Sequence, residues 1–411
     1  MIMHDSFRSA FPSLQRLHQG KPLIYLDGPG GTQVPEAVIK ACSDYYRTSN
    51  ANTHGQFITA RETDDILDDT RLACSDFLGA AGPHTISFGQ NMTTLNFSLS
   101  RAMARAWQPG DEVLITQLDH EANRGPWLAL REQGIVVREV RLLPEGHLDY
   151  EDLQAKLSDR TRLLAMGYSS NFMGTINDVA LARKLTHEVG AWLLLDAVHY
   201  APHYPMDVQS VDCDFLLCSA YKFYGPHIGL LYARPGLLDC LPVDRLRTAP
   251  QEAPFSMETG TLNHSALAGV GAALDFIASF GEGASRHGRL VSAMEHIQEH
   301  EAGLFAHLYH GLEAIPGCTI VGTGLDEAQR APTLALRLAD QHPTELCRKL
   351  GGANILAWDG HFYALRAAEV LGLRGVGGVT RLGISAYTTQ EEIDRVLDVI
   401  HRIATGHEIE V

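Results

Sequence analysis

Ala191-Trp-Leu-Leu-Leu-Asp196 and Asp214-Phe-Leu-Leu-Cys-Ser-Ala-Tyr-Lys222 are two short apolar runs, and each closes on charged or polar side chains. Their length and composition are typical of buried strands. Similar runs lie at 85–88, 112–116, 136–143, 162–168 and 229–233. Stretches with the spacing of amphipathic helices separate them, such as 91–107, 123–133 and 178–189. Alternating strands and helices predict an α/β fold with a mostly parallel sheet covered on both faces.

The pattern changes after about residue 265. A long helical stretch over 266–315 is interrupted by Gly281 and Gly283. Shorter apolar runs follow near 317–322, 332–338, 353–358 and 379–386, before a closing helical stretch at 389–404. This order predicts a smaller α+β domain. We therefore expect a large domain over 26–265, a small carboxy-terminal domain over 266–411, and an amino-terminal segment, 1–25, that packs on the small domain.

Composition excludes several classes of protein. The 411 residues carry a formal net charge of −16, so no global positive field exists to attract nucleic acid or anionic lipid. We see neither a signal-peptide pattern nor an apolar stretch long enough to span a membrane. The seven cysteines are scattered and form no Cys-x-x-Cys pair, which argues against a disulfide framework and a zinc ribbon. These features predict a cytoplasmic protein with no nucleic-acid or membrane partner.

The chemistry is expected where the predicted strands end, because open parallel sheets bind ligands outside the carboxyl ends of their strands. Lys222 is one of only six lysines and the only one directly after a buried-strand pattern. In apolar surroundings its pKa would fall, which suits a Schiff-base amine, although a solvated loop lysine is the common alternative. Asp196 ends the preceding strand. A carboxylate at this position can be a helix cap or a turn former, or it can be the anionic partner of a pyridine nitrogen. Together, the two residues are the signature that pyridoxal phosphate demands.

A phosphate group needs backbone donors at the start of a helix. The segment Phe88-Gly-Gln-Asn-Met-Thr-Thr94 follows a predicted strand and opens the helix expected over 91–107. Its glycine and small polar residues fit a phosphate site, and a plain helix N-cap is an equally common use of such residues.

These residues lie in motifs that resemble the class V aminotransferase family of pyridoxal-phosphate enzymes, and within it the cysteine desulfurases of the SufS-like type. The resemblance runs from Tyr25 to Arg395. Its motifs are LDHEAN (118–123), SSNFMGT (169–175), LDAVHYAPH (195–203), CSAYKFYGP (218–226), ETGTLN (258–263) and TRLGISAY (380–387). The resemblance implies the aspartate-aminotransferase-like fold, fold type I, and a pyridoxal 5'-phosphate cofactor.

The resemblance also implies roles for individual residues. It makes Lys222 the Schiff-base lysine, Asp196 the partner of the pyridine nitrogen, and His120 the imidazole that stacks on the cofactor ring and moves protons. His199 matches the donor to the ring's phenolic oxygen, often Gln in the family, and Asn171 an amide that contacts cofactor or substrate. Arg381 matches the arginine that binds the substrate carboxylate, and His361 aligns beside the substrate. The remaining matches are the phosphate cradle, Asn91, Met92, Ser219 and Tyr221, and Thr261, which implies a homodimer because it reaches the phosphate of the neighbouring subunit.

One family feature is missing. Desulfurases carry a nucleophilic cysteine on a small-domain loop after a Gly-His pair. Here Gly360 and His361 align with that pair, and the position of the nucleophile falls on Phe362 or Tyr363. Cys347 lies well before the loop, and no cysteine occurs between 348 and 411. Trp358 stands where desulfurases tend to carry a second arginine.

The persulfide step is therefore doubtful, whereas the cofactor residues are complete. The leading prediction is carbon–sulfur bond cleavage on a small amino acid, since elimination needs no enzyme thiol. Epimerisation and transamination stay open as alternatives, as does a catalytically silent binding module with the same fold.

Two other patterns suggest ligand sites more weakly. His296-Ile-Gln-Glu-His300 matches the H-x-x-E-H arrangement of some zinc peptidases, but it lies in a charged helical stretch without an evident third ligand. Gly28-Pro-Gly-Gly31 lacks the ending of a nucleotide-binding loop. We expect no metal site, a solvated helix face at 296–300, and an irregular turn near the substrate entrance at 28–31.

Overall fold

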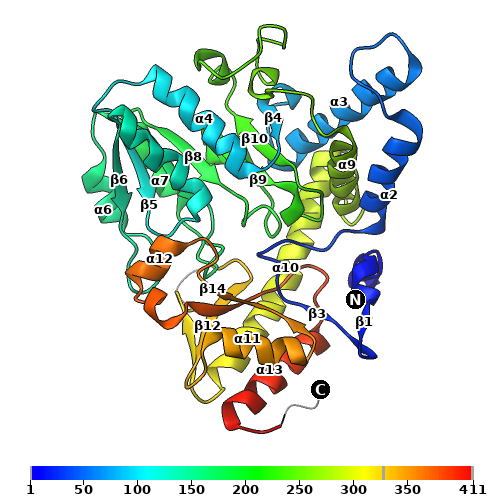
Figure 1. The fold of residues 1–411 in the computed structure, drawn as a ribbon, viewed down its shortest axis with the longest axis vertical. Helices are drawn as coiled ribbons and strands as arrows, with labels where there is room; N and C mark the ends of the chain where they lie inside the picture. The colour runs from blue at the N-terminus through cyan, green and yellow to red at the C-terminus, as the bar shows by residue number, and fades with distance from the viewer. Residues whose placement is uncertain (1, 326–328, 409–411) are drawn as a thin grey trace.

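The computed structural model describes residues 2–325 and 329–408. Within these residues the chain forms a large and a small domain, and the helix α10 (Arg286–Glu313) runs from one into the other (Figure 1). No helix in the described ranges is both long enough and apolar enough to cross a membrane.

The large domain is built on a seven-stranded sheet with the order β4-β10-β9-β8-β7-β5-β6. Its strands are β4 (Ile86–Gly89), β5 (Glu112–Thr116), β6 (Val136–Val140), β7 (Thr161–Gly167), β8 (Trp192–Asp196), β9 (Phe215–Ser219) and β10 (Gly229–Ala233). Neighbouring strands from β6 to β9 are parallel, and only β10 runs antiparallel, to both β9 and β4. The predicted α/β fold with a mostly parallel sheet is confirmed.

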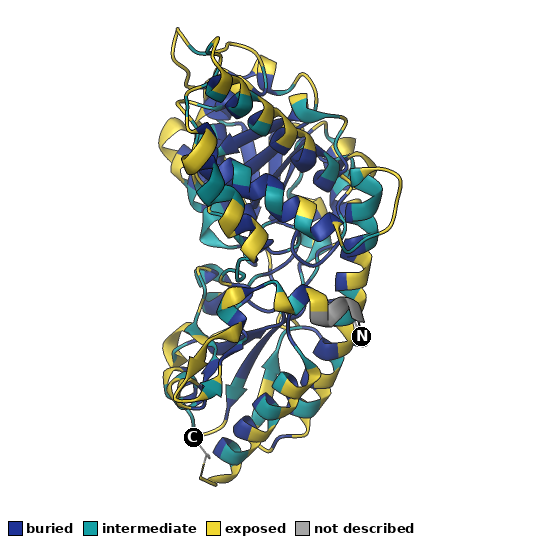
Figure 2. Cartoon of the chain, turned by 90° about the vertical axis from the view of Figure 1, so that its right-hand side faces the viewer, coloured by how far each residue is buried: buried dark blue, intermediate teal, exposed yellow. Residues whose placement is uncertain are grey.

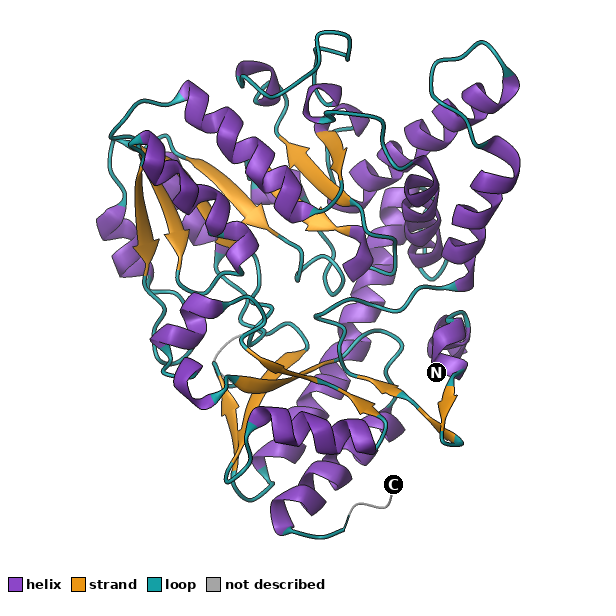
Figure 3. Ribbon diagram, in the orientation of Figure 1, coloured by secondary structure: helices purple, strands orange, loops and turns teal. Residues whose placement is uncertain are grey.

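Both faces of this sheet are covered, as Figure 3 shows. Leu193 and Leu195 of β8 pack in one core with the helices α3 (Ile58–Leu78), α7 (Val179–Glu188) and α9 (His264–Ala278). Leu194, between them, packs in a second core with α4 (Met92–Ala106) and α5 (Gly125–Leu128). Successive side chains of a strand point to opposite faces, so a sheet covered twice requires the continuous apolar runs found in the sequence.

The small domain carries a four-stranded antiparallel sheet with the order β11-β12-β15-β14. Its strands are β11 (Cys318–Val321), β12 (Thr333–Leu338), β14 (Trp358–Gly360) and β15 (Val379–Gly383). The helices α11 (Pro343–Gly352) and α13 (Gln390–Thr405) share an apolar core with this sheet and with α10. Figure 2 shows this core as a buried region separate from that of the large domain.

The amino-terminal segment contacts both domains, so the prediction that it packs on the small domain is incomplete. Arg8 of α1 (Ile2–Ser9) pairs with Glu392 of α13 at 2.7 Å, and β3 (Ile24–Tyr25) pairs with β13 (Ile355–Leu356) of the small domain. Phe11 also packs edge-on against Phe276 of α9, at a ring distance of 5.6 Å. Buried aromatic contacts of this kind attach the segment to the large domain as well.

Candidate active site

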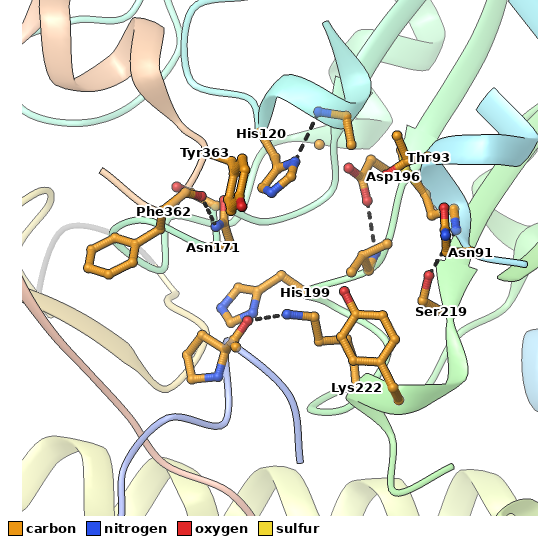
Figure 4. Close-up of a pocket in the computed structure, with 18 of the residues that line it drawn as sticks. Asn91, Thr93, His120, Asn171, Asp196, His199, Ser219, Lys222, Phe362 and Tyr363 are labelled. Carbon is orange, nitrogen blue, oxygen red and sulfur yellow. Dashed lines mark hydrogen bonds between the residues drawn. The ribbon is translucent and has the colours of Figure 1, made fainter. Parts of the chain in front are cut away.

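A cavity of about 810 Å³ lies where the carboxyl ends of the large-domain strands meet the small domain. Ten residues predicted for the site line it: Asn91, Met92, His120, Asn171, Asp196, His199, Ser219, Tyr221, Lys222 and Arg381. The strand ends of β5, β8 and β9 bring most of them together from distant parts of the chain (Figure 4).

Lys222 closes a short 3-10 turn directly after β9, and its side chain is buried. Its Nζ donates a hydrogen bond to the carbonyl of Pro29, in the irregular turn predicted near the substrate entrance. Burial, with Arg381 nearby, lowers the pKa of Lys222 to about 7, against the opposite effect of Asp27 and Asp196. An amine with this pKa is substantially neutral near pH 7, as a nucleophilic lysine must be.

Two buried carboxyl groups stand opposite the lysine. Asp196 ends β8 and accepts a hydrogen bond from the amide of Val198 at 3.0 Å. Burial raises the pKa of Asp196 to about 7, and the neighbouring Asp119 adds to that rise. Burial also raises the pKa of Asp119 to about 6, although Gly167 and Asn123 donate hydrogen bonds to it. A buried carboxylate such as Asp196 is stabilised by a cationic ligand.

His120 follows β5 and faces the cavity from the opposite side (Figure 4). Its Nδ1 accepts a hydrogen bond from the amide of Ala122 at 3.0 Å, which leaves the proton of the neutral ring on Nε2. Burial, together with the positive charges of Lys222 and Arg381, lowers the pKa of His120 to about 4. His120 is therefore a neutral imidazole throughout the physiological range.

The start of α4 lies at another edge of the cavity. Asn91 caps this helix through a hydrogen bond from the amide of Thr94 at 2.9 Å, and the amide of Met92 donates to the hydroxyl of Ser219 at 3.0 Å. Asn91 is thus an N-cap, as the common alternative predicted, and it also lines the cavity. A capped helix N-terminus beside a hydroxyl group suits an anion such as phosphate.

His199 lies on the floor of the cavity, and the pKa of its ring is lowered well below the usual value by burial. Its Nε2 is buried without a hydrogen-bond partner among the residues that the structure describes, and so is the hydroxyl of Ser169, which lines the same cavity. Behind His199, at a ring distance of 5.3 Å, His203 is paired with the buried Glu301 at 2.8 Å. Two unpaired polar groups facing one cavity indicate that a polar ligand completes them.

Arg381 comes from β15 of the small domain and is almost fully buried. Its guanidinium donates to the carbonyl of Asn171 at 3.0 Å and to the carboxylate of Asp27 at 3.3 Å. Burial lowers the pKa of Arg381 to about 10, so it stays a cation at neutral pH. A fixed guanidinium of this kind suits a substrate carboxylate.

The residues 357–364, called here the aromatic loop, form the small-domain wall of the cavity. Trp358, Phe362 and Tyr363 line the cavity, and no cysteine does so within 2–325 and 329–408. Cys347 lines a separate cavity of about 320 Å³, which shares Asp27 and Trp358 with the first. The wall that the sequence aligns with a nucleophilic thiol is therefore aromatic.

The comparisons with known proteins agree with this geometry. Residues 24–396 match the family model described as Aminotransferase class-V. The chain belongs to the class V aminotransferase family.

Similar proteins include cysteine desulfurases from Pectobacterium atrosepticum, 32% identical over 97% of each chain, and Escherichia coli, 31% identical over 97% of this chain and 98% of the other. The crystal structure of the cysteine desulfurase CsdA from Escherichia coli superposes with a TM-score of 0.84 and 27% identity, over 98% of this chain and 99% of that one. A cysteine desulfurase from Thermococcus onnurineus NA1, 24% identical over 98% of both chains, shares the fold with a TM-score of 0.88.

Class V aminotransferases depend on pyridoxal phosphate, and the cavity of this family member fits that cofactor. A buried lysine of lowered pKa, a buried carboxylate, a helix N-terminus and the unpaired Nε2 of His199 all face one space. The aldehyde of the cofactor requires an amine, its ring nitrogen requires a carboxylate, and its phosphate requires an anion site.

The structure does not bring one predicted residue, His361, into the cavity. His361 is exposed and lies outside the lining, because Gly360 has a φ of 116° and the backbone turns there, which directs Phe362 and Tyr363 inward instead. Thr261 is exposed and outside the lining of this chain's own cavity, and its contact with the cofactor of a neighbouring subunit stays a prediction.

The two weaker motifs have ordinary surroundings. His296 is exposed, and Nε2 of His300 donates a hydrogen bond to the backbone carbonyl of Thr388 at 3.0 Å. In the part of the chain that is described, no group of three metal-ligating side chains comes together.

Sequence reasoning missed further residues that line the cavity. Asp119 follows a predicted strand beside His120 and was expected among the polar residues at the strand ends, but no role was assigned to it. His227 stacks on Tyr221 with a ring distance of 4.7 Å, and only its nearness to the Lys222 motif pointed to it. The inward direction of Phe362 and Tyr363 had no signal in the sequence.

Proposed function

We propose that this protein cleaves the carbon–sulfur bond of a cysteine-type amino acid by pyridoxal-phosphate chemistry, without forming a persulfide on an enzyme cysteine. One observation carries the proposal: the cavity combines Lys222, Asp196 and Arg381 with an aromatic wall and contains no cysteine in the described residues. Its relatives from Pectobacterium and Escherichia coli are cysteine desulfurases, which supports a sulfur-containing substrate.

The residues that line the cavity have different roles in the proposed reaction. Arg381 binds the substrate carboxylate, and Asn91, Met92, Ser219 and Tyr221 hold the cofactor phosphate. Asp196 would pair with the ring nitrogen of the cofactor, and His199 would donate a hydrogen bond to its phenolic oxygen. Pyridoxal phosphate, when bound, supplies an electron sink that makes the bonds at the substrate Cα labile.

Lys222 is the base of the proposed reaction, and His120 shields the cofactor. Lys222, whose pKa is about 7, would remove the proton from Cα of the bound substrate. His120, neutral at physiological pH and protonated on Nε2, covers the cofactor ring and keeps water out. Loss of the Cα proton allows the bond from Cβ to sulfur to break, and the sulfur departs as a thiolate.

An amino-acid panel tests this proposal. Purified protein loaded with pyridoxal phosphate is incubated with L-cysteine, S-methyl-L-cysteine and L-alanine, and sulfide or thiol, pyruvate, ammonia and deuterium exchange at Cα are followed. We expect thiol or sulfide with equal pyruvate, and no loss of rate after the cysteines are alkylated. A persulfide on the protein, detected by mass spectrometry, would refute the persulfide-free route.

The same panel separates the alternatives. Deuterium exchange at Cα without sulfide or pyruvate indicates epimerisation, and formation of a new amino acid from an added keto acid indicates transamination. Absence of a visible absorbance band after addition of the cofactor indicates a silent binding module.

We also propose a homodimer in which Thr261 of each copy reaches the cofactor phosphate of the neighbouring copy. Exposed apolar side chains gather on the consecutive elements from α2 (Glu36–Asp44) to α3: Ile39, Tyr46, Phe57, Ile58 and Leu72. An apolar surface of this kind usually faces a partner. Sedimentation should give the mass of a dimer, and Ile58→Asp should shift it towards the monomer.

The cellular compartment is part of the same proposal. All seven cysteines are free, and Cys240 is exposed. Free exposed thiols persist in reducing compartments, so we place the protein in the cytoplasm. This assignment is tested by fractionating cells that express a fluorescently tagged chain and measuring which fraction contains the fluorescence.

A further inference from the structure

The aromatic loop is held firmly against the large domain by its backbone. The carbonyl of Tyr363 accepts a hydrogen bond from the amide of Glu121 at 2.7 Å, and the carbonyl of Phe362 accepts one from the side-chain amide of Asn171 at 2.9 Å. Phe362 and Tyr363 both have positive φ values, 51° and 60°. Bulky residues keep this conformation only where their surroundings hold them in it. The loop is therefore a fixed wall.

The two aromatic rings of this wall have different surroundings. The ring of Phe362 lies 4.0 Å from the guanidinium of Arg381, so it is occupied in supporting that residue. The ring of Tyr363 packs against His120 at 5.2 Å on one side only, and Tyr363 remains 69% exposed. Trp358 is 59% exposed although it lines the same cavity. Two large aromatic faces thus stand open at one cavity.

The direction of a bound amino acid follows from its two anchors. Arg381 would hold its carboxylate, and Lys222 lies where its amino group reacts. The aromatic loop contacts both Arg381, through Phe362, and His120, through Tyr363. Tyr363 and Trp358 line the same cavity as these anchors, so their rings are available to the substituent on Cβ of an amino acid held there.

This space is larger than cysteine requires. The cavity measures about 810 Å³, near the upper end of the range for sites that enclose drug-sized ligands. A cofactor and a thiol group leave much of it unfilled, and its small-domain wall presents the rings of Trp358 and Tyr363.

We propose that the substrate is an S-substituted cysteine, a thioether whose sulfur carries an apolar or aromatic group, and that Tyr363 and Trp358 are the residues that select it. The inference rests on the proposed carbon–sulfur cleavage and names its substrate class. Aromatic side chains stack on an apolar or aromatic group of this kind, whereas they cannot stack on water or on a bare thiol.

The reaction balances without an oxidant or a second thiol. With S-benzyl-L-cysteine, the Cα proton goes to the base, and the bond from Cβ to sulfur breaks with its electron pair on sulfur. The sulfur takes up a proton and leaves as phenylmethanethiol. The remaining 2-aminoacrylate is hydrolysed by one water molecule to pyruvate and ammonia. No thiol of the enzyme is needed, in agreement with the composition of the wall.

Binding of ligands that cannot be cleaved tests the selection directly. 2-Amino-5-phenylpentanoate replaces the sulfur of S-benzyl-L-cysteine by a methylene group, and 2-aminopentanoate lacks the phenyl ring. Calorimetry on the full chain loaded with cofactor should show the phenyl ligand binding roughly tenfold more tightly or better. Tyr363→Ala and Trp358→Ala should each weaken the phenyl ligand by roughly tenfold and leave 2-aminopentanoate within roughly twofold.

Matched variants separate stacking from general damage. Tyr363→Phe keeps the ring and should keep the affinity for the phenyl ligand. Phe97→Ala removes an exposed aromatic side chain of α4 that does not line the cavity, and should change neither affinity. The Ala variants leave the carbonyl anchor of the loop in place, and if Tyr363→Ala fails to fold, Trp358→Ala carries the test because its side chain is largely exposed.

The outcomes are distinct. Equal affinity of the wild-type protein for both ligands, or unchanged affinities in both Ala variants, overturns the inference. Thiol release from S-methyl-L-cysteine without a preference for the phenyl ligand overturns the inference and leaves the proposed function standing. A preference for the phenyl ligand without thiol release from S-benzyl-L-cysteine overturns the proposed function, and the substrate assignment with it.

Discussion

The cavity has two walls, and they are built by different means. The wall at the strand ends presents Asp196 as the last residue of β8 and Lys222 in the turn that follows β9, and both strands are neighbours in the buried sheet. The aromatic loop presents Phe362 and Tyr363 from a turn with positive φ values, held by hydrogen bonds to the other domain.

This difference separates the general chemistry from the specific chemistry. The strand-end wall holds the groups that any enzyme of the class V aminotransferase family needs for its cofactor. The aromatic loop provides no thiol to accept sulfur, and in the proposed reaction it is the wall that faces the departing group. Changes in the first wall should therefore abolish all reactions, whereas changes in the second should alter the choice of substrate.

The largest effect is expected for Lys222→Ala. Without the buried amine the cofactor has no covalent attachment and the Cα proton no base, so the visible absorbance band should vanish and activity should fall by roughly 10³-fold or more. Absorbance spectroscopy and pyruvate release measure the two losses. Lys184→Ala, which removes an exposed lysine of α7, is the control. A lysine variant that keeps an unchanged band would show that another residue binds the cofactor.

A smaller loss is expected for Asp196→Asn. The amide is nearly the same size but carries no negative charge, so the ring nitrogen loses its anionic partner while the cofactor stays bound. Turnover should fall by roughly 10²-fold, with a displaced absorbance maximum. Stopped-flow measurement of the chemical step gives the magnitude, and activity within twofold of the wild type would remove Asp196 from the site.

Asp214→Asn serves as the control for this substitution. Asp214 is also buried and comes just before β9, but it pairs with Arg183 at 3.3 Å and Arg234 at 3.2 Å, and it does not line the cavity. Its loss should lower the free energy of unfolding by about 1–3 kcal/mol and leave the absorbance spectrum unchanged.

The lowered pKa of Lys222, in the wall at the strand ends, should also determine how the rate of cofactor uptake depends on pH. Only the neutral amine of Lys222 reacts, and because its pKa is lowered to about 7, that form predominates above about pH 7. The rate at which the visible band grows after mixing with pyridoxal phosphate should rise about tenfold per pH unit below the pKa and level off above it. A rate that still rises towards pH 10 would indicate an exposed, ordinary lysine.

The same contrast explains what could be predicted from the sequence. β5 and β10 lie at the predicted residues 112–116 and 229–233, and Lys222 and Asp196 were found because a strand end is a local signal. The run 353–358 was predicted as one strand, but Ile355 and Leu356 pair with β3 whereas Trp358 begins a strand of another sheet. That division depends on pairing partners far away in the chain.

The orientation of the aromatic loop could not be predicted for a related physical reason. Alignment with a cysteine-bearing loop identified the position of Phe362 and Tyr363 but favoured His361 for the site. Positive φ values at Gly360, Phe362 and Tyr363 reverse this order, and hydrogen bonds across the domain interface hold Phe362 and Tyr363 in place. No local pattern of residues encodes such a contact.

The smallest effect is expected for Cys347→Ser, which tests whether any thiol supports the aromatic loop. Cys347 lies on α11 and lines the second cavity, beyond Trp358 and Asp27. Burial raises the pKa of its thiol to about 11, so only about one molecule in several thousand carries the thiolate at pH 7.5. Thiol release from S-methyl-L-cysteine should therefore stay within about twofold of the wild type, as it should in the control Cys240→Ser, which changes an exposed cysteine. If thiol release falls more than tenfold in Cys347→Ser alone, and a persulfide is found on Cys347 after incubation with L-cysteine, then sulfur reaches the second cavity. In that case the thiol of Cys347 takes part in the cleavage, and the aromatic loop does not act alone.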